Sequence, residues 1–225
     1  MARRGFFLLG RINSKSDIFG PQYRRHRDIC EYVKKILPNR KARILDVGCG
    51  AGRIASILKE GGYVTIDGVD VLPEEKVTGA IDHYWRINLD AGEWGSNLGR
   101  KYDLIICSDV LEHLENPAST LRQMSNLLID TGEILISIPN AFNVMERCRI
   151  LLTGNSGRYA VEKRGECGHI AMFTDNIMTS LLERADLGIV EKIGGAMFFF
   201  GFSWFPGRTV SPLLSYYVIY RIKKK

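Results

Sequence analysis

The stretch Arg43-Ile-Leu-Asp-Val-Gly-Cys-Gly-Ala-Gly52 runs from an apolar segment of strand length directly into three alternating glycines. An amphipathic segment, Arg53–Glu60, follows at once and predicts a helix. Glycine adopts backbone conformations that side chains exclude, so the chain can turn sharply here and approach a bound molecule closely. The order of strand, glycine loop and helix predicts a ligand-binding loop at the end of the first strand of an α/β sheet.

Outward from this stretch, apolar runs of strand length alternate with amphipathic segments of helix length, which is typical of a parallel sheet covered by helices. The sequence predicts strands at residues 43–47, 64–69, 83–87, 102–108, 132–138, 188–195 and 215–222. It predicts helices at residues 53–60, 72–77, 117–128, 143–152 and 174–187. We therefore expect an α/β fold, a Rossmann-like doubly wound sheet of seven strands that is mostly parallel, with an antiparallel last strand and helices on both faces.

Length and charge limit the number of domains and the class of partner. The chain has 225 residues and 45% hydrophobic side chains, values ordinary for one globular domain. Residues 1–27 carry seven basic and one acidic side chain, whereas residues 28–225 carry 24 of each. A nucleic-acid-binding fold is expected to hold its basic excess on the folded body, so this distribution disfavours a nucleic acid partner. We expect a single domain with a basic arm and cap helix (1–42), a ligand-binding core (43–140), and a substrate-side lid with the last strands (141–225).

Cysteine usage and apolar runs indicate the compartment. The five cysteines are odd in number, widely spaced and never in a C-x-x-C pair, which argues against a disulfide framework and a zinc ribbon. The apolar run within Met1–Leu9 is too short for a secretory signal, and Ala196–Pro206 is about half the length of a bilayer crossing. We therefore expect a cytoplasmic protein.

The aromatic stretch Phe198–Phe205 predicts core and lid packing. The alternatives are an apolar substrate wall or a peripheral membrane contact aided by Lys223–Lys225.

A carboxylate at a defined distance strengthens the interpretation of the glycine loop. Alternating glycines alone also serve tight turns that bind nothing. About twenty residues further on, however, the second predicted strand ends at Asp70, whose carboxylate can accept hydrogen bonds from both hydroxyls of a ribose. No Lys-Ser/Thr pair follows the glycines, so a phosphate-gripping P-loop is excluded.

The motifs together resemble those of a known family. The class I S-adenosylmethionine-dependent methyltransferases carry successive motifs similar to Leu45–Arg53, Asp70, Asn88–Asp90, Ser108–Leu114 and Ser137–Asn140. The resemblance is strong over residues 43–140 and looser beyond. The chain most resembles the subgroup with the ubiquinone-type O-methyltransferases and the small methyltransferases of bacterial polysaccharide pathways, which have an element similar to Gly168-His-Ile-Ala-Met-Phe-Thr174.

This resemblance implies S-adenosyl-L-methionine as cofactor, S-adenosyl-L-homocysteine as product, and a set of binding residues. At the methionine part, Gly48, Cys49 and Gly50 would pass beneath the cofactor. Asp46 would order the loop and the nearby amino group. Those implied at the nucleoside are Asp70 on the ribose hydroxyls, Val71 against one adenine face, and Asn88 and Leu89 beside the adenine. Ser108 and Asp109 would lie close to the reacting methyl group.

The implied reaction is methyl transfer to a small-molecule acceptor, more readily at oxygen than at nitrogen, with a glycan or isoprenoid-linked acceptor favoured by the subgroup. An RNA or protein methyltransferase is the first alternative. For amino targets it would carry an Asn/Asp-Pro-Pro-aromatic element after the fourth strand, where this chain has Ser108-Asp-Val-Leu111. The second alternative is a cofactor-binding regulatory protein without turnover. The oligomeric state is not implied by the sequence.

His113 is the candidate catalytic residue. A sulfonium methyl group is already activated, so the protein mainly has to align the reactants and accept a proton from a hydroxyl acceptor. Histidine suits that task because its ordinary pKa lies near neutrality. The alternative is a structural role in the helix cap or core. A third hypothesis is a divalent metal held by Asp109, Glu112, His113 and His169. The ubiquinone-type and small-RNA end methyltransferases have a similar Glu-x-x-Glu-His arrangement. Of the three hypotheses, metal dependence is not the favoured one.

Two segments, residues 1–27 and 153–173, are expected to be the most mobile parts of the free protein and to become ordered with ligand. One interpretation of the arm Arg3–Arg27 is a solvated tail. The other is a segment similar to the family's helical cap, because Phe19 and Tyr23 are interleaved with Arg24, Arg25 and Arg27 before the first helix. An arginine there would meet the methionine carboxylate. The glycine-rich segment Thr153–Gly168 is expected to be a mobile insertion.

Overall fold

A computed structural model describes residues 21–155, 169–199, 202–204, 211 and 213–225. The expectations for residues 1–20, for most of the insertion 153–168 and for the side chains of the stretch Phe198–Phe205 therefore lie outside the described part of the chain. No helix among the described residues is long and apolar enough to cross a bilayer.

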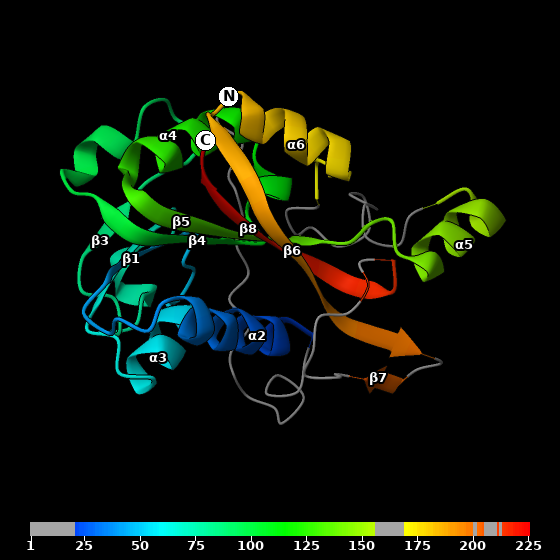
Figure 1. Ribbon diagram of the computed structural model, residues 1–225, viewed down its shortest axis with the longest axis horizontal. Coiled ribbons are helices and arrows are strands. Elements are labelled where there is room, and N and C mark those ends of the chain that lie inside the picture. Colours follow the sequence, from blue (N-terminus) through cyan, green and yellow to red (C-terminus); the bar gives the residue numbers. More distant parts are fainter. Residues whose placement is uncertain (1–20, 156–168, 200–201, 205–210, 212) are drawn as a thin grey trace.

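The sheet confirms the expected Rossmann-like class, and Figure 1 shows it running through the centre of the molecule. Its strand order is β3-β2-β1-β4-β5-β8-β6-β7. Strands β1 to β5 pair in parallel, whereas β8 is antiparallel to both β5 and β6. The bounds are Arg43–Val47 (β1), Thr65–Asp70 (β2), Tyr84–Arg86 (β3), Tyr102–Ser108 (β4), Leu128–Pro139 (β5), Leu187–Phe199 (β6), Phe202–Trp204 (β7) and Ser215–Lys224 (β8).

Helices cover both faces of this sheet, as Figure 1 shows with α2 and α3 on one side and α4 and α6 on the other. One buried cluster packs α2 and α3 against sheet residues such as Ile44 and Ile106. A second packs α4 and α6 against sheet residues such as Val47 and Ile105. The α-helices are Pro21–Ile36 (α2), Arg53–Glu60 (α3), Pro117–Leu127 (α4), Val144–Thr153 (α5) and Asp175–Glu183 (α6). The short 3-10 helices are Glu74–Lys76 (η1), Gly95–Leu98 (η2) and Leu111–His113 (η3).

The structure differs from the sequence expectation at several elements, including α2, β5 and β7. Helix α2 begins at Pro21, so Arg24, Arg25 and Arg27 lie inside a helix rather than before one. Proline is favoured in the first turn, where its missing N–H is not needed. Strand β5 starts at Leu128, directly after α4, because Leu128 pairs with Tyr102. An eighth strand, β7, extends the sheet beyond the seven expected by pairing with the end of β6.

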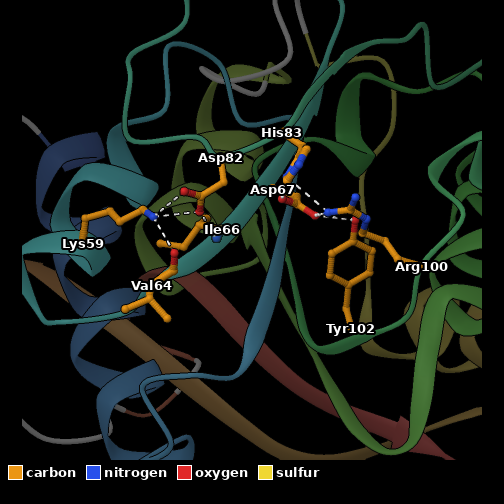
Figure 2. Close-up of polar contacts among 8 residues, drawn as sticks. All are labelled: Lys59, Val64, Ile66, Asp67, Asp82, His83, Arg100 and Tyr102. Atoms are coloured by element: carbon orange, nitrogen blue, oxygen red, sulfur yellow. Dashed lines mark hydrogen bonds and ion pairs between the residues drawn. The ribbon is translucent and has the colours of Figure 1, made fainter.

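A polar cluster fastens non-adjacent strands on one face of the sheet (Figure 2). The Asp67 carboxylate on β2 is fully buried and accepts hydrogen bonds from the Tyr102 hydroxyl at 3.0 Å and from Arg100 Nη1 at 3.2 Å. His83 Nδ1 lies 3.0 Å from the same carboxylate. Because β1 separates β2 from β4, Asp67 bridges across an intervening strand. A second pair in the same view, Lys59 with Asp82, is partly exposed.

Replacing Asp67 with alanine is expected to destabilise the protein by about 2 to 3 kcal/mol, because it leaves the buried Tyr102 hydroxyl and the Arg100 guanidinium without their acceptor. Lys59→Ala is the matched control, since a partly exposed ion pair contributes less than about 1 kcal/mol. Urea unfolding of both variants measures the difference. Equal losses would show that the Asp67 cluster contributes no more than a surface pair.

Candidate functional site

The glycine loop lies at the carboxyl edge of the sheet, beside the switch point between β1 and β4, where open α/β sheets bind their ligands. The backbone N–H groups of Gly48 and Cys49 donate to the Val69 carbonyl at 2.8 and 3.2 Å, which holds the loop against the end of β2. Gly48 has a φ of +71°, and a β-carbon there would lie 2.3 Å from Val110 Cγ2. Only glycine therefore fits this turn.

Asp70 completes the loop. Its carboxylate is 9% exposed and accepts the N–H of Gly50 at 2.7 Å on one oxygen and the N–H of Leu72 at 3.0 Å on the other. Each carboxylate oxygen offers more than one acceptor position, so both oxygens retain capacity for further donors such as ribose hydroxyls. The loop amide at Gly50 thus contacts Asp70.

Asp46 places a buried carboxyl group beside the loop. It is 1% exposed, and its Oδ2 atom has no hydrogen-bond partner among the described residues. Burial, and then the nearby charge of Asp70, raise the pKa of Asp46 to about 7. Bringing a cationic group such as an ammonium or sulfonium close to Asp46 would favour its ionised form, so the electrostatics suit a positively charged ligand.

The residues expected at the adenine come from two neighbouring strand ends. Val71 follows β2 and is 41% exposed, which leaves its side chain open to a flat ring. Asn88 is exposed, and its side-chain oxygen accepts the N–H of Asp90 at 3.1 Å. Leu89 is buried in the core cluster on the α4 face. The Ile87 N–H donates to the Asp70 carbonyl at 2.8 Å, so this segment lies beside the expected ribose site.

The end of β4 holds a polar cluster built partly by α2. Asp109 has a φ of +55°, unusual for a non-glycine residue, and Nη2 of Arg25 lies 2.5 Å from its Oδ2 atom. Ser137 on β5 fixes the same turn, since its carbonyl accepts the Asp109 N–H at 3.0 Å and its hydroxyl lies 2.9 Å from that of Ser108. The sequence did not single out Ser137 as a site residue, although its place at the end of a neighbouring strand could have indicated it.

Arg25 has unused hydrogen-bonding capacity at this position. It is 5% exposed, its guanidinium lies 5.3 Å from the Tyr217 ring centroid, and its Nε and Nη1 atoms find no acceptor among the described residues. Buried guanidinium donors normally pair with a carboxylate or a carbonyl. The geometry is consistent with the expectation that an arginine near the N-terminus meets the methionine carboxylate.

Glu112, His113 and His169 gather just beyond this turn. Glu112 is fully buried, and neither carboxyl oxygen has a hydrogen-bond partner among the described residues. Burial, followed by the charge of Asp109, raises its pKa well above the ordinary value. His169 Nε2 lies 3.8 Å from Glu112 Oε1, and the two imidazole centroids are 4.9 Å apart. The Glu112 carbonyl accepts the N–H groups of Ile170 and Ala171, which anchors the histidine segment.

This cluster is also a candidate metal centre. One ligand atom from each of Glu112, His113 and His169 lies within 4.8 Å of the others. The buried carboxyl oxygens of Glu112 lack partners, and a carboxylate with two imidazoles suits a divalent transition metal, so the residues present fit such an ion. Asp109, the fourth residue of the hypothetical set, is paired with Arg25 instead.

Comparison with known proteins identifies the family. A family model described as a methyltransferase domain matches residues 22–192. Ubiquinone biosynthesis O-methyltransferase of Hydrogenovibrio crunogenus is 30% identical over 134 residues, which cover 56% of this chain and 54% of the relative. The mitochondrial ubiquinone biosynthesis O-methyltransferase of Arabidopsis thaliana is 25% identical over 168 residues, covering 70% and 50%. The chain thus spans about half the length of the curated relatives it matches.

Solved structures agree on the fold. An S-adenosylmethionine-dependent methyltransferase from Clostridium acetobutylicum superimposes with a TM-score of 0.64 at 15% identity, covering 93% of this chain and 97% of that one. Magnesium protoporphyrin IX methyltransferase from Synechocystis, crystallised with S-adenosylhomocysteine, gives 0.60 at 17% identity, covering 96% and 90%. With the matched domain spanning more than half of the chain, the protein belongs to the class I S-adenosylmethionine-dependent methyltransferases.

Proposed function

We propose that this protein transfers the methyl group of S-adenosylmethionine to a hydroxyl oxygen of a small-molecule acceptor, with His113 as general base. The observation that carries the proposal is the placement of His113 and His169 beside buried Glu112, at the edge where β1, β2 and β4 present the glycine loop and Asp70. An imidazole at this edge can take a proton from an acceptor aligned with the sulfonium.

The step is an in-line displacement. A lone pair of the acceptor oxygen forms the new bond to the methyl carbon as the bond from that carbon to sulfur breaks, and the sulfur keeps the bonding pair as a neutral thioether. The hydroxyl proton passes to the His113 imidazole. Because the electrophile is already activated, most of the acceleration comes from alignment and the rest from proton removal.

The carboxylates around the loop favour the charged cofactor over the neutral product. Burial, and then the nearby charge of Asp70, raise the pKa of Asp46. The positive φ values of Gly48 and Gly50 let the loop backbone approach a bound ligand closely. The sulfonium and the ammonium of S-adenosylmethionine both relieve the repulsion between Asp46 and Asp70, whereas the thioether product relieves it only through its ammonium. We infer that this difference assists product exchange.

The candidate metal centre supports a second mechanism for the same reaction. A divalent ion held by Glu112, His113 and His169 would act as a Lewis acid that lowers the pKa of the acceptor hydroxyl. His113 would then be a ligand and His169 would be as important as His113.

The class of acceptor is inferred from relatives. Those named ubiquinone biosynthesis O-methyltransferase support an oxygen acceptor, and we infer that it is glycan-linked or isoprenoid-linked. The balanced charge of residues 28–225 supports a small molecule over RNA.

Replacing Asp70 with alanine is expected to weaken S-adenosylhomocysteine binding about tenfold or more, because hydrogen bonds to a charged group contribute roughly 1.5 to 3 kcal/mol. Isothermal titration calorimetry measures the change. Glu75→Ala, which removes an exposed carboxylate five residues further on, is the control and should bind normally. Unchanged affinity of Asp70→Ala would remove Asp70 from the cofactor site.

A further inference from the structure

Helix α5 turns its apolar side to solvent. Leu151 and Leu152 are 84% and 83% exposed, and Met145 is 63% exposed, although an isolated surface helix normally buries such residues. Figure 1 shows α5 projecting from the carboxyl edge of the sheet, away from the other helices. This is the largest group of exposed apolar side chains on any described helix.

The exposed residues form one stripe. At 3.6 residues per turn, Val144, Met145, Cys148, Leu151 and Leu152 fall within about 120° of the helix circumference. All five are exposed. Exposed Arg147 and Arg149 lie about 40° beyond the two borders of this stripe. Opposite its centre, Glu146 is 8% exposed and faces the body.

The orientation of α5 is fixed by its connections. Asn143 caps the helix by accepting the Glu146 N–H at 2.9 Å, and its side chain donates to the Asn140 carbonyl at 2.9 Å. The Val144 N–H donates to the Leu213 carbonyl at 2.9 Å. Leu213 and Leu214 are themselves 47% and 41% exposed, so they extend the apolar stripe at its N-terminal end.

We propose that this stripe lies on the surface of an anionic lipid membrane. An apolar face bordered by arginines on both sides is typical of a helix that lies in the interface, where the side chains enter the acyl boundary and the cations meet lipid phosphates. A second copy of the chain would place arginines against arginines, and the formal net charge of +6 adds to that repulsion. Charge complementarity therefore favours a negative surface.

The position of α5 gives this contact a consequence for the site. The helix begins five residues after β5 ends at Pro139, at the same edge as the glycine loop and His113. A membrane beneath α5 would lie at the same edge of the sheet as the site, so an acceptor with a lipid tail could reach it without leaving the bilayer surface. The docking itself does not depend on the proposed reaction.

Flotation with lipid vesicles tests the proposal. The parent protein should bind vesicles of phosphatidylcholine with phosphatidylglycerol, and bind vesicles of phosphatidylcholine alone less well. Combining Leu151→Gln with Leu152→Gln should lower partitioning at least tenfold on anionic vesicles. Combining Arg147→Gln with Arg149→Gln should lower it roughly tenfold on anionic vesicles and little on neutral ones. Val64→Gln, at a 55% exposed valine on the other edge of the sheet, should change nothing.

A fluorescent label on Cys148 provides a second measurement. Cys148 is exposed whereas Cys30, Cys49 and Cys107 are buried, so a polarity-sensitive dye attaches there once Cys167 is replaced by serine. Its emission should shift to the blue on anionic vesicles. The proposal would be overturned if the parent protein did not partition, or if partitioning survived in the double leucine variant. It would also be overturned if that variant had a lower melting temperature or lost a dimer that the parent forms, because either result would show that protein covers the stripe.

Discussion

Replacing His113 with alanine is expected to lower the single-turnover rate of methyl transfer by roughly a hundredfold while leaving the affinity for S-adenosylhomocysteine nearly intact. The imidazole lies in the Glu112 and His169 cluster, so its loss removes the proton acceptor without touching the glycine loop or Asp70. Three measurements on the same preparation check this: the melting temperature, product affinity by calorimetry, and the single-turnover rate with a hydroxyl acceptor. The rate alone should fall.

Two other outcomes have distinct signatures. If Glu112, His113 and His169 hold a metal, a chelator should abolish activity of the parent protein, and His169→Ala should be as impaired as His113→Ala. If His113 is purely structural, His113→Ala should lose thermal stability and cofactor affinity together, with no specific defect in transfer. That result would contradict both proposed mechanisms.

Replacing Gly48 with alanine is expected to lower the melting temperature by roughly 5 to 15 °C. The substitution forces a side chain into a φ of +71°, which costs about 1 to 2 kcal/mol. It also places a β-carbon 2.3 Å from Val110 Cγ2, a buried and stiff β-branched side chain. Such overpacking costs about 1 to 3 kcal/mol, and each kcal/mol lowers the melting temperature of a chain of this size by about 2 to 4 °C.

Gly50→Ala is the matched control because Gly50 has a φ of +53° but open space where a β-carbon would lie. The melting temperature of Gly50→Ala should fall by only a few degrees, because this variant has the strain of the positive φ without the steric overlap. In a Val110→Ala background, Gly48→Ala should cost no more than Gly50→Ala, since the overlapping methyl groups are gone. A Gly48→Ala protein as stable as the parent would contradict the close packing of the loop on Val110.

Elements set by local pattern were predictable from the sequence. Strands β1 and β4 and helix α3 have the expected bounds, because buried apolar runs and the glycine loop mark their ends. The start of α2 was missed, since three arginines close together suggested a solvated arm. In the structure Arg25 is buried against Asp109, a partner that directly follows the distant strand β4. No local pattern reveals such a contact.

The site was predictable where its residues follow strand ends and not where segments converge from far apart. Gly48, Asp70 and Asp109 could be placed at one edge because parallel strands end together. The approach of His169 to Glu112 was anticipated only through the family element, since it depends on how the segment before α6 packs. The stripe on α5 has a clear helical period in the sequence, but its direction depends on what the rest of the fold leaves uncovered.

The ion pair between Arg25 and Asp109 also bears on the order in which the protein assembles. The two residues are 84 positions apart, so the contact closes a long stretch of chain and can form only after β4 is in place. A ribosome-bound fragment ending within β4 would therefore contain the glycine loop and Arg25 but not Asp109, the partner that holds Arg25 at the site. Ligand binding should be weak in that fragment and should stabilise only the complete chain, because a ligand adds stability solely to the state that binds it.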